Sequence, residues 1–206
     1  MDVYLASGNS HKRKEFADLL NCDRLALNLF DANLVGGMPE VDESAETFAG
    51  NAQIKADALY RKVPQGAWIL ADDSGLVIDA LDGQPGVRSA RFAGVGANDQ
   101  DNIKKVRKEL WARGLNSSPA RFVCALAFVQ VQGAVAIFRG TCEGVVIDQE
   151  RGVSGFGYDP IFIPVGYDKT FAELGSSIKH NLSHRANAVG KLKSFLHFEV
   201  EEQNQY

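Results

Sequence analysis

The 206-residue chain has few cysteines, no excess of positive charge and no long apolar run. Cys22, Cys124 and Cys142 lie far apart without Cys-x-x-Cys spacing, so neither a disulfide framework nor a zinc site is indicated, and a reducing compartment fits. A formal net charge of −4 argues against a partner such as duplex nucleic acid, whose binding proteins normally carry a basic surface. Because no stretch reaches the length of a membrane span and the N-terminus lacks a secretion signal, we expect a cytoplasmic protein with no membrane partner.

Two common nucleotide-binding motifs are missing as well. The loop after the first apolar segment lacks the Gly-x-x-x-x-Gly-Lys-Ser/Thr spacing of a P-loop and the Gly-x-Gly-x-x-Gly of a dinucleotide site. Gly155-Phe156-Gly157 is only superficially similar, because Pro160 follows and starts an extended run rather than a helix. These absences exclude the two commonest phosphate loops but not phosphate binding itself.

The order of the apolar patterns predicts an α/β fold, with a mixed sheet flanked by helices. The length suits a single domain over residues 1–206, with a second lobe over roughly residues 76–150. Two long apolar segments joined at Gln132-Gly133 predict a hairpin. The expected strands cover residues 2–7, 24–30, 68–72, 76–81, 121–131 and 134–147, and the expected helices cover residues 10–21, 47–63, 98–113 and 183–198.

The most informative segment is Asp72-Asp73-Ser74-Gly75, which follows an apolar strand. Carboxylate oxygens are the ligands that Mg²⁺ requires, and such sites typically take substrate phosphates as further ligands. The same residue types also dominate ordinary turns. The segment therefore indicates either a metal and phosphate site or a turn at the end of the strand.

The N-terminal segment favours the first alternative. A short apolar strand runs from Met1 to Ser7, a small-residue loop follows, and a helical pattern then places Lys12 in its first turn. Cations are mildly destabilising at that end of a helix unless an anion binds there, and glycine-containing loops at helix N-termini are natural phosphate sites. The alternative is a solvated basic helix face.

Two further groups have alternative interpretations. In the predicted helix 47–63, Asn51 and Lys55 flank the apolar stripe, so the Lys55 amine either is solvated or points into a cleft. His184 and Arg185 start the last helix after Ser183, and their backbone amides are able to donate to a ligand such as a purine carbonyl oxygen. Phe156, in a glycine-rich loop, either packs internally or stacks on a base.

Together these segments resemble the inosine triphosphate pyrophosphatase family, also called the Ham1-like or non-canonical purine nucleotide pyrophosphatases. The resemblance covers nearly the whole chain, in family order. It is carried by Ser7-Gly8-Asn9 with Lys12, Pro39-Glu40, Thr47-Phe48 with Asn51-Ala52 and Lys55-Ala56, Ala71-Asp72-Asp73-Ser74-Gly75-Leu76, Pro85-Gly86-Val87 with Ser89-Ala90-Arg91, Gly155-Phe156-Gly157-Tyr158-Asp159-Pro160 and Ser183-His184-Arg185.

The resemblance implies a Mg²⁺-dependent homodimer that converts purine nucleoside triphosphates such as ITP, dITP and XTP to the monophosphate and pyrophosphate. It also implies a long twisted mixed sheet with an active cleft between two lobes. Asp73 matches the proposed general base and a metal ligand, and Glu40 matches the second metal ligand of several members. The implied substrate contacts are Ser7, Gly8, Asn9, Ser10, His11, Lys12, Lys55, Ser74, Phe156, Gly157, Tyr158, Asp159, Lys179, His184 and Arg185.

The chain departs from the family pattern at three points. Ser7 replaces the commoner threonine and keeps the hydroxyl, whereas Arg88 stands where tyrosine is usual. His180 separates Lys179 from Asn181, which are usually adjacent, but the interval from Lys179 to His184 is intact.

Three other functions compete with this one. A Maf-like nucleotide pyrophosphatase shares the Leu-Ala-Ser opening, but a Pro-Arg-Arg run is expected after it and Gly-Asn-Ser-His-Lys stands here. A non-catalytic nucleotide-binding module would not need Glu40, Asp72 and Asp73, which this chain retains. A single-strand nucleic-acid binder disagrees with the acidic balance of charge.

Overall fold

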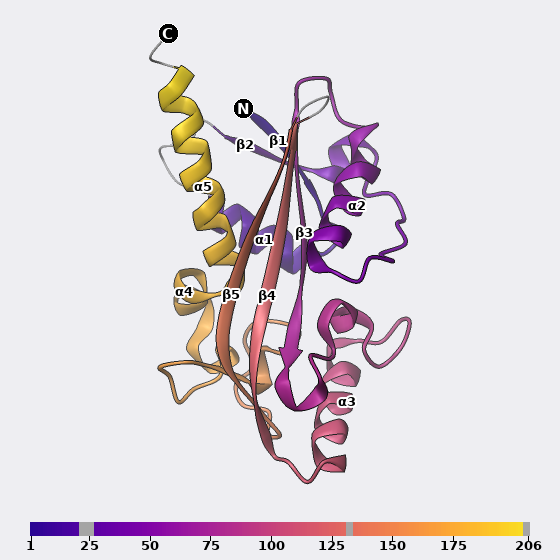
Figure 1. Ribbon diagram of the computed structural model, residues 1–206, viewed down its shortest axis with the longest axis vertical. Coiled ribbons are helices and arrows are strands. Elements are labelled where there is room, and N and C mark those ends of the chain that lie inside the picture. The colour runs from indigo at the N-terminus through magenta and orange to yellow at the C-terminus, as the bar shows by residue number, and fades with distance from the viewer. Residues whose placement is uncertain (21–26, 131–133, 204–206) are drawn as a thin grey trace. The chain divides into compact units, whose positions relative to one another are not determined.

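The computed structural model describes residues 1–20, 27–130 and 134–203 as an α/β protein (Figure 1). The strands are β1 Asp2–Ala6, β2 Asn28–Asp31, β3 Trp68–Ile78, β4 Ser117–Gln130, β5 Val135–Ile147 and β6 Phe162–Pro164. The helices are α1 Ser10–Leu20, α2 Phe48–Tyr60, α3 Asp99–Ala112, α4 Phe171–Leu182 and α5 His184–Gln203. Short 3-10 helices, labelled η, cover Ala32–Val35, Asp79–Leu81, Gly86–Arg91 and Asp159–Ile161.

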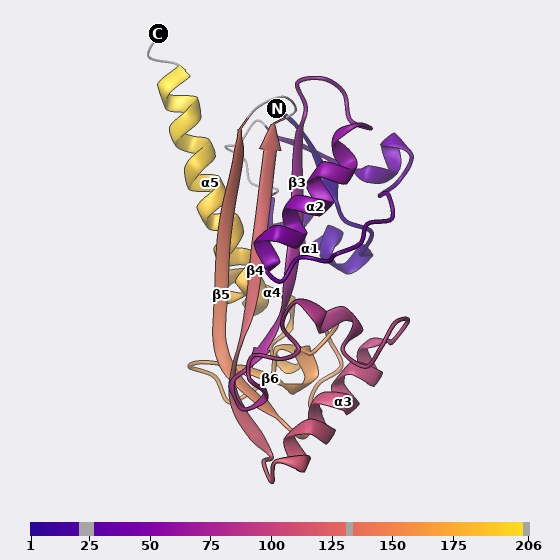
Figure 2. The ribbon, with the colours of Figure 1, turned by 45° about the vertical axis from the view of Figure 1, so that its right-hand side comes forward.

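The described strands form one six-stranded sheet in the order β2-β1-β3-β4-β5-β6, in which β3, β4 and β5 are the long neighbouring strands (Figure 2). β1 pairs in parallel with both β2 and β3, whereas β5 and β6 are antiparallel. The prediction of a mixed sheet flanked by helices is therefore confirmed. β4 and β5 are neighbours, as a hairpin requires, although Gln132-Gly133 lies outside the described residues, as does the first part of the strand expected over 24–30.

One predicted boundary is wrong. The sequence suggested two strands, over 68–72 and 76–81, with Asp72 to Gly75 between them, but β3 runs without interruption from Trp68 to Ile78. Asp and Gly are depleted in strands and Ser is common in turns, so the sequence predicted an interruption at this segment. Because the two aspartates lie within the strand, they project on its two sides rather than from its end.

Helix α4 is an element that the sequence analysis missed. It begins after a capping box, in which the Thr170 hydroxyl accepts from the Glu173 amide and the Glu173 carboxylate accepts from the Thr170 amide. Thr170-Phe171-Ala172-Glu173 is therefore a readable start signal. Gly175, at φ 78° and ψ 177°, interrupts the helical geometry and disturbs the apolar periodicity by which a helix is recognised.

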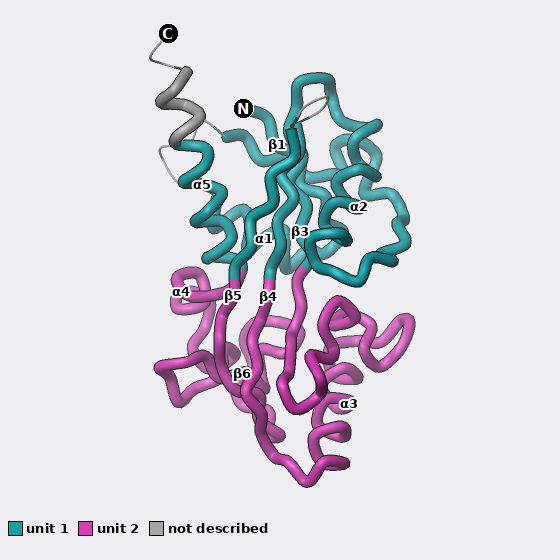
Figure 3. Tube along the Cα trace, in the orientation of Figure 1, with its two compact units in different colours: residues 1–73, 124–140, 185–206 teal, residues 74–123, 141–184 magenta. Residues whose placement is uncertain are grey.

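The chain divides into two compact units (Figure 3). Unit 1 comprises residues 1–73, 124–140 and 185–206, and unit 2 comprises residues 74–123 and 141–184. The second lobe expected over 76–150 covers part of unit 2 and omits residues 151–184. The boundaries cross β3, β4 and β5, so these strands contribute residues to both units.

In unit 1, helices pack on both faces of the sheet because its strands alternate their side chains. One apolar cluster joins Leu70 of β3 to Phe16 of α1 and to Val189 and Leu192 of α5. A second cluster joins Ile69 and Ala71 of the same strand to residues of α2. Alternate residues of β3 therefore face α1 and α5 on one side and α2 on the other.

Unit 2 has its own apolar core. Leu76 and Ile78 of β3 pack there with Ile103 and Val106 of α3 and with residues of β4, β5, β6 and α4. Tyr158, which the sequence analysis placed in a glycine-rich loop, belongs to this core and is 5% exposed. The loop is therefore attached to a packed body rather than projecting from it.

Candidate active site

In unit 1, Asp72 faces the side of β3 that carries α1 and α5. Its Oδ2 lies 2.8 Å from the Lys12 Nζ, near the start of α1, and 3.9 Å from the Arg185 Nε, in the first turn of α5. The carboxylate is buried, with 1% of the side chain exposed. Burial by itself would raise the pKa of Asp72, but Lys12, Arg185 and Lys55 outweigh it and hold this pKa well below its usual range. Asp72 is therefore a permanently ionised anchor for two cations.

Asp73 faces the opposite side of the strand, toward α2. Its Oδ1 accepts from the Lys55 Nζ at 2.9 Å, and its Oδ2 accepts from the Asn51 Nδ2 at 3.3 Å. The same Lys55 nitrogen lies 3.0 Å from the Glu43 carboxylate and donates to the Asp72 carbonyl at 3.1 Å. Since Asn51 and Lys55 are one helical turn apart, both reach the same carboxylate.

The electrostatics of this pair suit a proton acceptor. Burial raises the pKa of Asp73, and the nearby Lys55, which lowers it, only partly offsets that effect. For Lys55, burial lowers the pKa, but Asp72, Asp73 and Glu43 outweigh burial and raise it. Lys55 thus stays cationic beside a carboxylate that is a stronger base than an ordinary aspartate.

The loop between β1 and α1 contains the predicted phosphate-binding residues. Ser7 is buried, Gly8 to His11 are exposed and Lys12 is partly buried. The Asn9 Oδ1 accepts from the backbone amides of His11 and Lys12, at 2.9 and 3.1 Å, and so caps the helix. The backbone amides of His11 and Lys12 therefore already have a partner within the loop.

Arg185 is not an exposed side chain at the start of α5. Its guanidinium is 4% exposed, and its Nη1 lies 2.7 Å from the Glu15 Oε2 on α1. Glu15 was missed by the sequence analysis, although it stands three residues after Lys12 and so lies on the same face of the helix. Asp72 and Glu15 together hold the charge of Arg185 inside unit 1.

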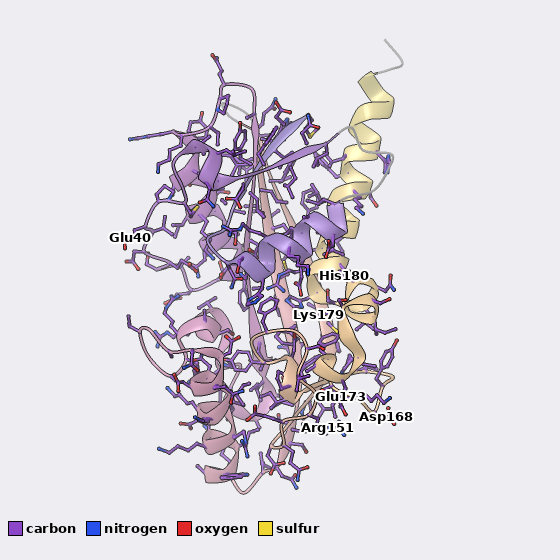
Figure 4. The ribbon with its side chains drawn as sticks, turned by 180° about the vertical axis from the view of Figure 1, so that it is seen from behind. Glu40, Arg151, Asp168, Glu173, Lys179 and His180 are labelled. Atoms are coloured by element: carbon purple, nitrogen blue, oxygen red, sulfur yellow. The ribbon has the colours of Figure 1, made fainter. Side chains whose placement is uncertain are left out.

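Unit 2 contains the predicted base-binding loop. The Lys179 Nζ lies 2.7 Å from the Asp159 Oδ2, with both side chains buried, and 4.5 Å from the centre of the Phe156 ring. The same Asp159 oxygen accepts from the Phe156 amide at 3.0 Å. Lys179 is labelled in Figure 4 beside His180 of the same helix, α4. An ion pair therefore fixes the loop while Phe156 remains half-buried.

Two longer-range contacts hold the same loop. The Tyr158 hydroxyl donates to the Ser89 carbonyl at 2.8 Å, and the Gly157 amide donates to the Asp99 Oδ2 at 2.6 Å. Burial and the Asp99 carboxylate both raise the pKa of Tyr158, which therefore remains a neutral donor. Asp99 was not among the predicted site residues.

Two predicted residues of unit 2 have unexpected surroundings. The His184 ring stacks on Phe122, with the ring centres 4.8 Å apart, and its side chain is 2% exposed. Ser74 is half-buried within β3. The ring of His184 is thus packed inside unit 2, and the contact of its backbone amide with a ligand stays a prediction.

The two predicted metal ligands, Glu40 and Asp73, differ in burial, since Glu40 is exposed and Asp73 is buried. Glu40 is exposed in the segment between the first 3-10 helix and α2, and Figure 4 shows it at the edge of the ribbon. Glu43, three residues later, is the carboxylate that shares Lys55 with Asp73. Within residues 1–20, 27–130 and 134–203 no three acidic, histidine or cysteine side chains are grouped to hold a metal ion.

No helix in the described part of the chain is both long and apolar enough to cross a membrane. The candidate functional residues are therefore the acidic and basic side chains of unit 1 and the loop around Phe156 in unit 2.

Comparison with known proteins gives a consistent result. The family model described as "Ham1 family" matches residues 3–195. A protein of Opitutus terrae named dITP/XTP pyrophosphatase is 45% identical over 196 residues, which cover 93% of this chain and 97% of that protein. A Bacillus anthracis protein of the same name is 46% identical, over 93% of this chain and 94% of that protein.

The structural comparison agrees with the sequence comparison. The structure of a HAM1 protein from Coxiella burnetii matches with a TM-score of 0.85 and 37% identity, over 95% of this chain and 98% of that one. The fold, the ordered motifs and the matches over nearly the whole length lead to one conclusion: the chain belongs to the Ham1 family.

Proposed function

We propose that this protein hydrolyses non-canonical purine nucleoside triphosphates, namely dITP, XTP and ITP, to the monophosphate and pyrophosphate. One observation carries the proposal: in a chain of the Ham1 family, a buried strand presents a carboxylate of raised pKa, Asp73, directly beside the ammonium of Lys55. The names of the relatives indicate the substrates. Removal of these nucleotides from the nucleotide pool would be the consequence.

Asp73 is assigned the role of general base. A carboxylate accepts a proton from water more readily when its pKa is raised, provided that it is ionised at the working pH. Lys55, at 2.9 Å, lowers the pKa of Asp73 against the effect of burial and would supply positive charge for a phosphate oxygen. Water activated in this way would attack the α-phosphorus, and the pyrophosphate would leave without a covalent intermediate.

Lys12 is assigned to the departing phosphates. Its ammonium is paired with Asp72, so a bound triphosphate would compete with a buried carboxylate for it. Arg185, already 3.9 Å from that carboxylate, would keep Asp72 compensated while Lys12 turns to the phosphates. Charge is then redistributed without leaving an isolated buried anion.

The donor chemistry of unit 1 fits Mg²⁺ that arrives with the nucleotide. Mg²⁺ often uses one or two carboxylates and takes its other ligands from phosphates and water, so a cluster of three protein ligands is not needed. Two carboxylates, Asp73 and Glu43, already converge on the ammonium of Lys55, so this side of β3 is arranged around a cation. Asp73 and Glu40 would hold the metal, with Glu43 as the neighbouring alternative, and the bound ion would neutralise phosphate charge.

Base recognition is assigned to unit 2. Phe156 would stack on the purine, and the backbone amide of His184 would donate to its 6-oxo group, which adenine lacks. Buried donors without a partner reject the wrong base strongly, so ATP would be a poor substrate. We further propose, from the family resemblance, that the enzyme is a cytoplasmic homodimer.

The deciding experiment is pyrophosphate release from a panel of dITP, XTP, ITP, ATP and GTP, with and without Mg²⁺. We expect monophosphate and pyrophosphate as the first products from the first three nucleotides, only with the metal. Nucleoside diphosphate and free phosphate as first products would contradict the proposal. Light scattering after size-exclusion chromatography tests the dimer.

A further inference from the structure

We propose that Asp99 is a positioning residue for base recognition, acting through the backbone of the loop from Gly155 to Asp159. The inference rests on the proposed function, because it assumes that this loop meets the purine. It concerns a side chain on α3, a helix to which neither the family motifs nor the sequence analysis gave a role. All contacts that carry it lie within unit 2.

The loop is held unevenly along its length. Its C-terminal half is fixed by buried groups, since Tyr158 bonds to Ser89 and Asp159 pairs with Lys179. Between these anchors and Phe156 stands Gly157, at φ 62°, a conformation that glycine adopts without strain. Phe156 is itself joined to Asp159, whose Oδ2 accepts from the Phe156 amide at 3.0 Å. A glycine is also the residue with the most freedom to leave such a conformation, so the path of the backbone between Phe156 and Tyr158 depends on what fixes Gly157.

Asp99 supplies that restraint. Its Oδ2 accepts from the Gly157 amide at 2.6 Å, a short hydrogen bond between an ionised acceptor and a backbone donor. The two residues are 58 positions apart, so the contact joins the loop to another element of the same unit. The carboxylate is also close enough to Tyr158 to raise the pKa of its hydroxyl. It therefore lies directly against the middle of the loop.

The geometry separates Asp99 from an ordinary helix-capping residue. The start of α3 is capped by Asn98 and Asp101, whose side chains and amides form a reciprocal capping box. Both Asp99 and Asp101 add negative charge to the first turn, which stabilises the helix. Only the carboxylate of Asp99 is bonded to Gly157 among the described residues, so its neighbour Asp101 is a matched control.

The test compares Asp99→Ala, Asp99→Asn and Asp101→Ala in the full chain. We expect Asp99→Ala to raise the KM for dITP about fivefold, the effect of losing one exposed charge-assisted hydrogen bond, with kcat changed less than twofold. Asp99→Asn retains an oxygen acceptor and should restore most of the loss. Asp101→Ala should lower the thermal midpoint at least as much as Asp99→Ala while leaving the KM unchanged.

Hydrogen exchange at the Gly157 amide gives a readout that is independent of activity. We expect Asp99→Ala, but not Asp101→Ala, to accelerate this exchange about tenfold or more. The inference is overturned if both alanine variants change the KM equally, or if Asp99→Ala exposes the Gly157 amide without changing the KM. If the parent protein releases no pyrophosphate from dITP or XTP, the proposed function itself is wrong. If the parent is active and Asp99→Ala has the same KM as the parent, only the inference about Asp99 is wrong.

Discussion

Asp72 and Asp73 are consecutive in β3 but face opposite sides of the sheet, so Lys12 on α1 pairs with the first and Lys55 on α2 pairs with the second. Strand geometry alone enforces this separation, because successive side chains alternate. The result is two carboxylates with different tasks: the pKa of Asp72 is held far below that of an ordinary aspartate, and the pKa of Asp73 is raised. The two carboxylates still share their cations, because Lys55 also lowers the pKa of Asp72 and Lys12 also lowers that of Asp73.

The first prediction follows from this division. Asp73→Asn keeps the shape of the side chain but removes the proton acceptor and one proposed metal ligand, so we expect turnover of dITP to fall by roughly two orders of magnitude or more. Pyrophosphate release measures it. Asp57→Asn, on the exposed face of α2, is the control and should retain full turnover. A folded Asp73→Asn variant with near-normal turnover would move the general base elsewhere.

The second prediction concerns stability. Asp72→Asn leaves Lys12 without its buried counter-charge and Arg185 with Glu15 alone, so we expect the free energy of unfolding at pH 7 to fall by about 2 to 4 kcal/mol. Urea unfolding followed by circular dichroism measures this loss. Asp73→Asn, in the same strand, should cost less because burial already opposes its charge.

The dependence of that stability on pH has a definite sign. Because folding lowers the pKa of Asp72, the stabilisation is fully present above the pKa of an unfolded aspartate and disappears as the pH falls toward the lower, folded pKa. We therefore expect the difference between the parent and Asp72→Asn to shrink between pH 5 and pH 2. A constant difference across this range would show that Asp72 acts through packing rather than charge.

The sequence predicted most of the elements, although not α4, and it did not predict which side of β3 each aspartate faces. Clear apolar patterns predicted the first strand and three of the helices. The structure contains each of them, as β1, α1, α2 and α5. The strand was predicted to end at Asp72, whereas the charges that make a buried Asp-Asp tolerable inside it, on Lys12, Lys55 and Arg185, come from distant parts of the chain. Local propensity contains no information about such partners.

The residues that were missed share a similar cause. Glu43 and Asp99 stand in or beside loops, and their roles depend on which backbone or ammonium the fold brings to them. The spacing of Glu15 from Lys12 places both residues on one face of α1, but that spacing does not predict that Glu15 pairs with Arg185. Sequence patterns indicate whether a segment forms a helix or a strand. They do not indicate which distant side chains that segment will contact.

The third prediction uses the raised pKa of Asp73. If ionised Asp73 is the base, kcat/KM should fall on the acid side with an apparent pKa above that of an ordinary aspartate. Glu43 raises the pKa of Asp73, so Glu43→Gln should move this acid limb to lower pH. The pH profile of kcat/KM for dITP tests both statements. An acid limb that moves upward in Glu43→Gln would contradict the electrostatic assignment.

The fourth prediction separates a metal that arrives with the substrate from a structural one. We expect EDTA to abolish pyrophosphate release and Mg²⁺ to restore it, because the phosphates would complete the ligand set. In the absence of nucleotide, EDTA should leave the thermal midpoint unchanged, since residues 1–20, 27–130 and 134–203 contain no cluster of three metal-ligating side chains. A lower midpoint in EDTA alone would indicate a resident ion.

The last prediction concerns Gly155, whose φ of 83° and close approach to the Asp159 carboxylate both require glycine. A β-carbon there would collide with the Asp159 Oδ2, the oxygen that pairs with Lys179. Gly155→Ala should therefore disturb the ion pair that fixes the loop and raise the KM for dITP about tenfold or more, the result of disrupting a buried charge pair.

Gly166→Ala is the matched control, because Gly166 has a similar φ of 87° but open space around the position of a β-carbon. It should pay only the backbone strain, about 1 to 2 kcal/mol of unfolding free energy, and keep the KM of the parent. Urea unfolding and steady-state kinetics on both variants make the comparison. If the two variants lose equal stability and neither changes the KM, the Asp159–Lys179 pair does not position the loop for the base, and recognition must depend on the helix start at His184.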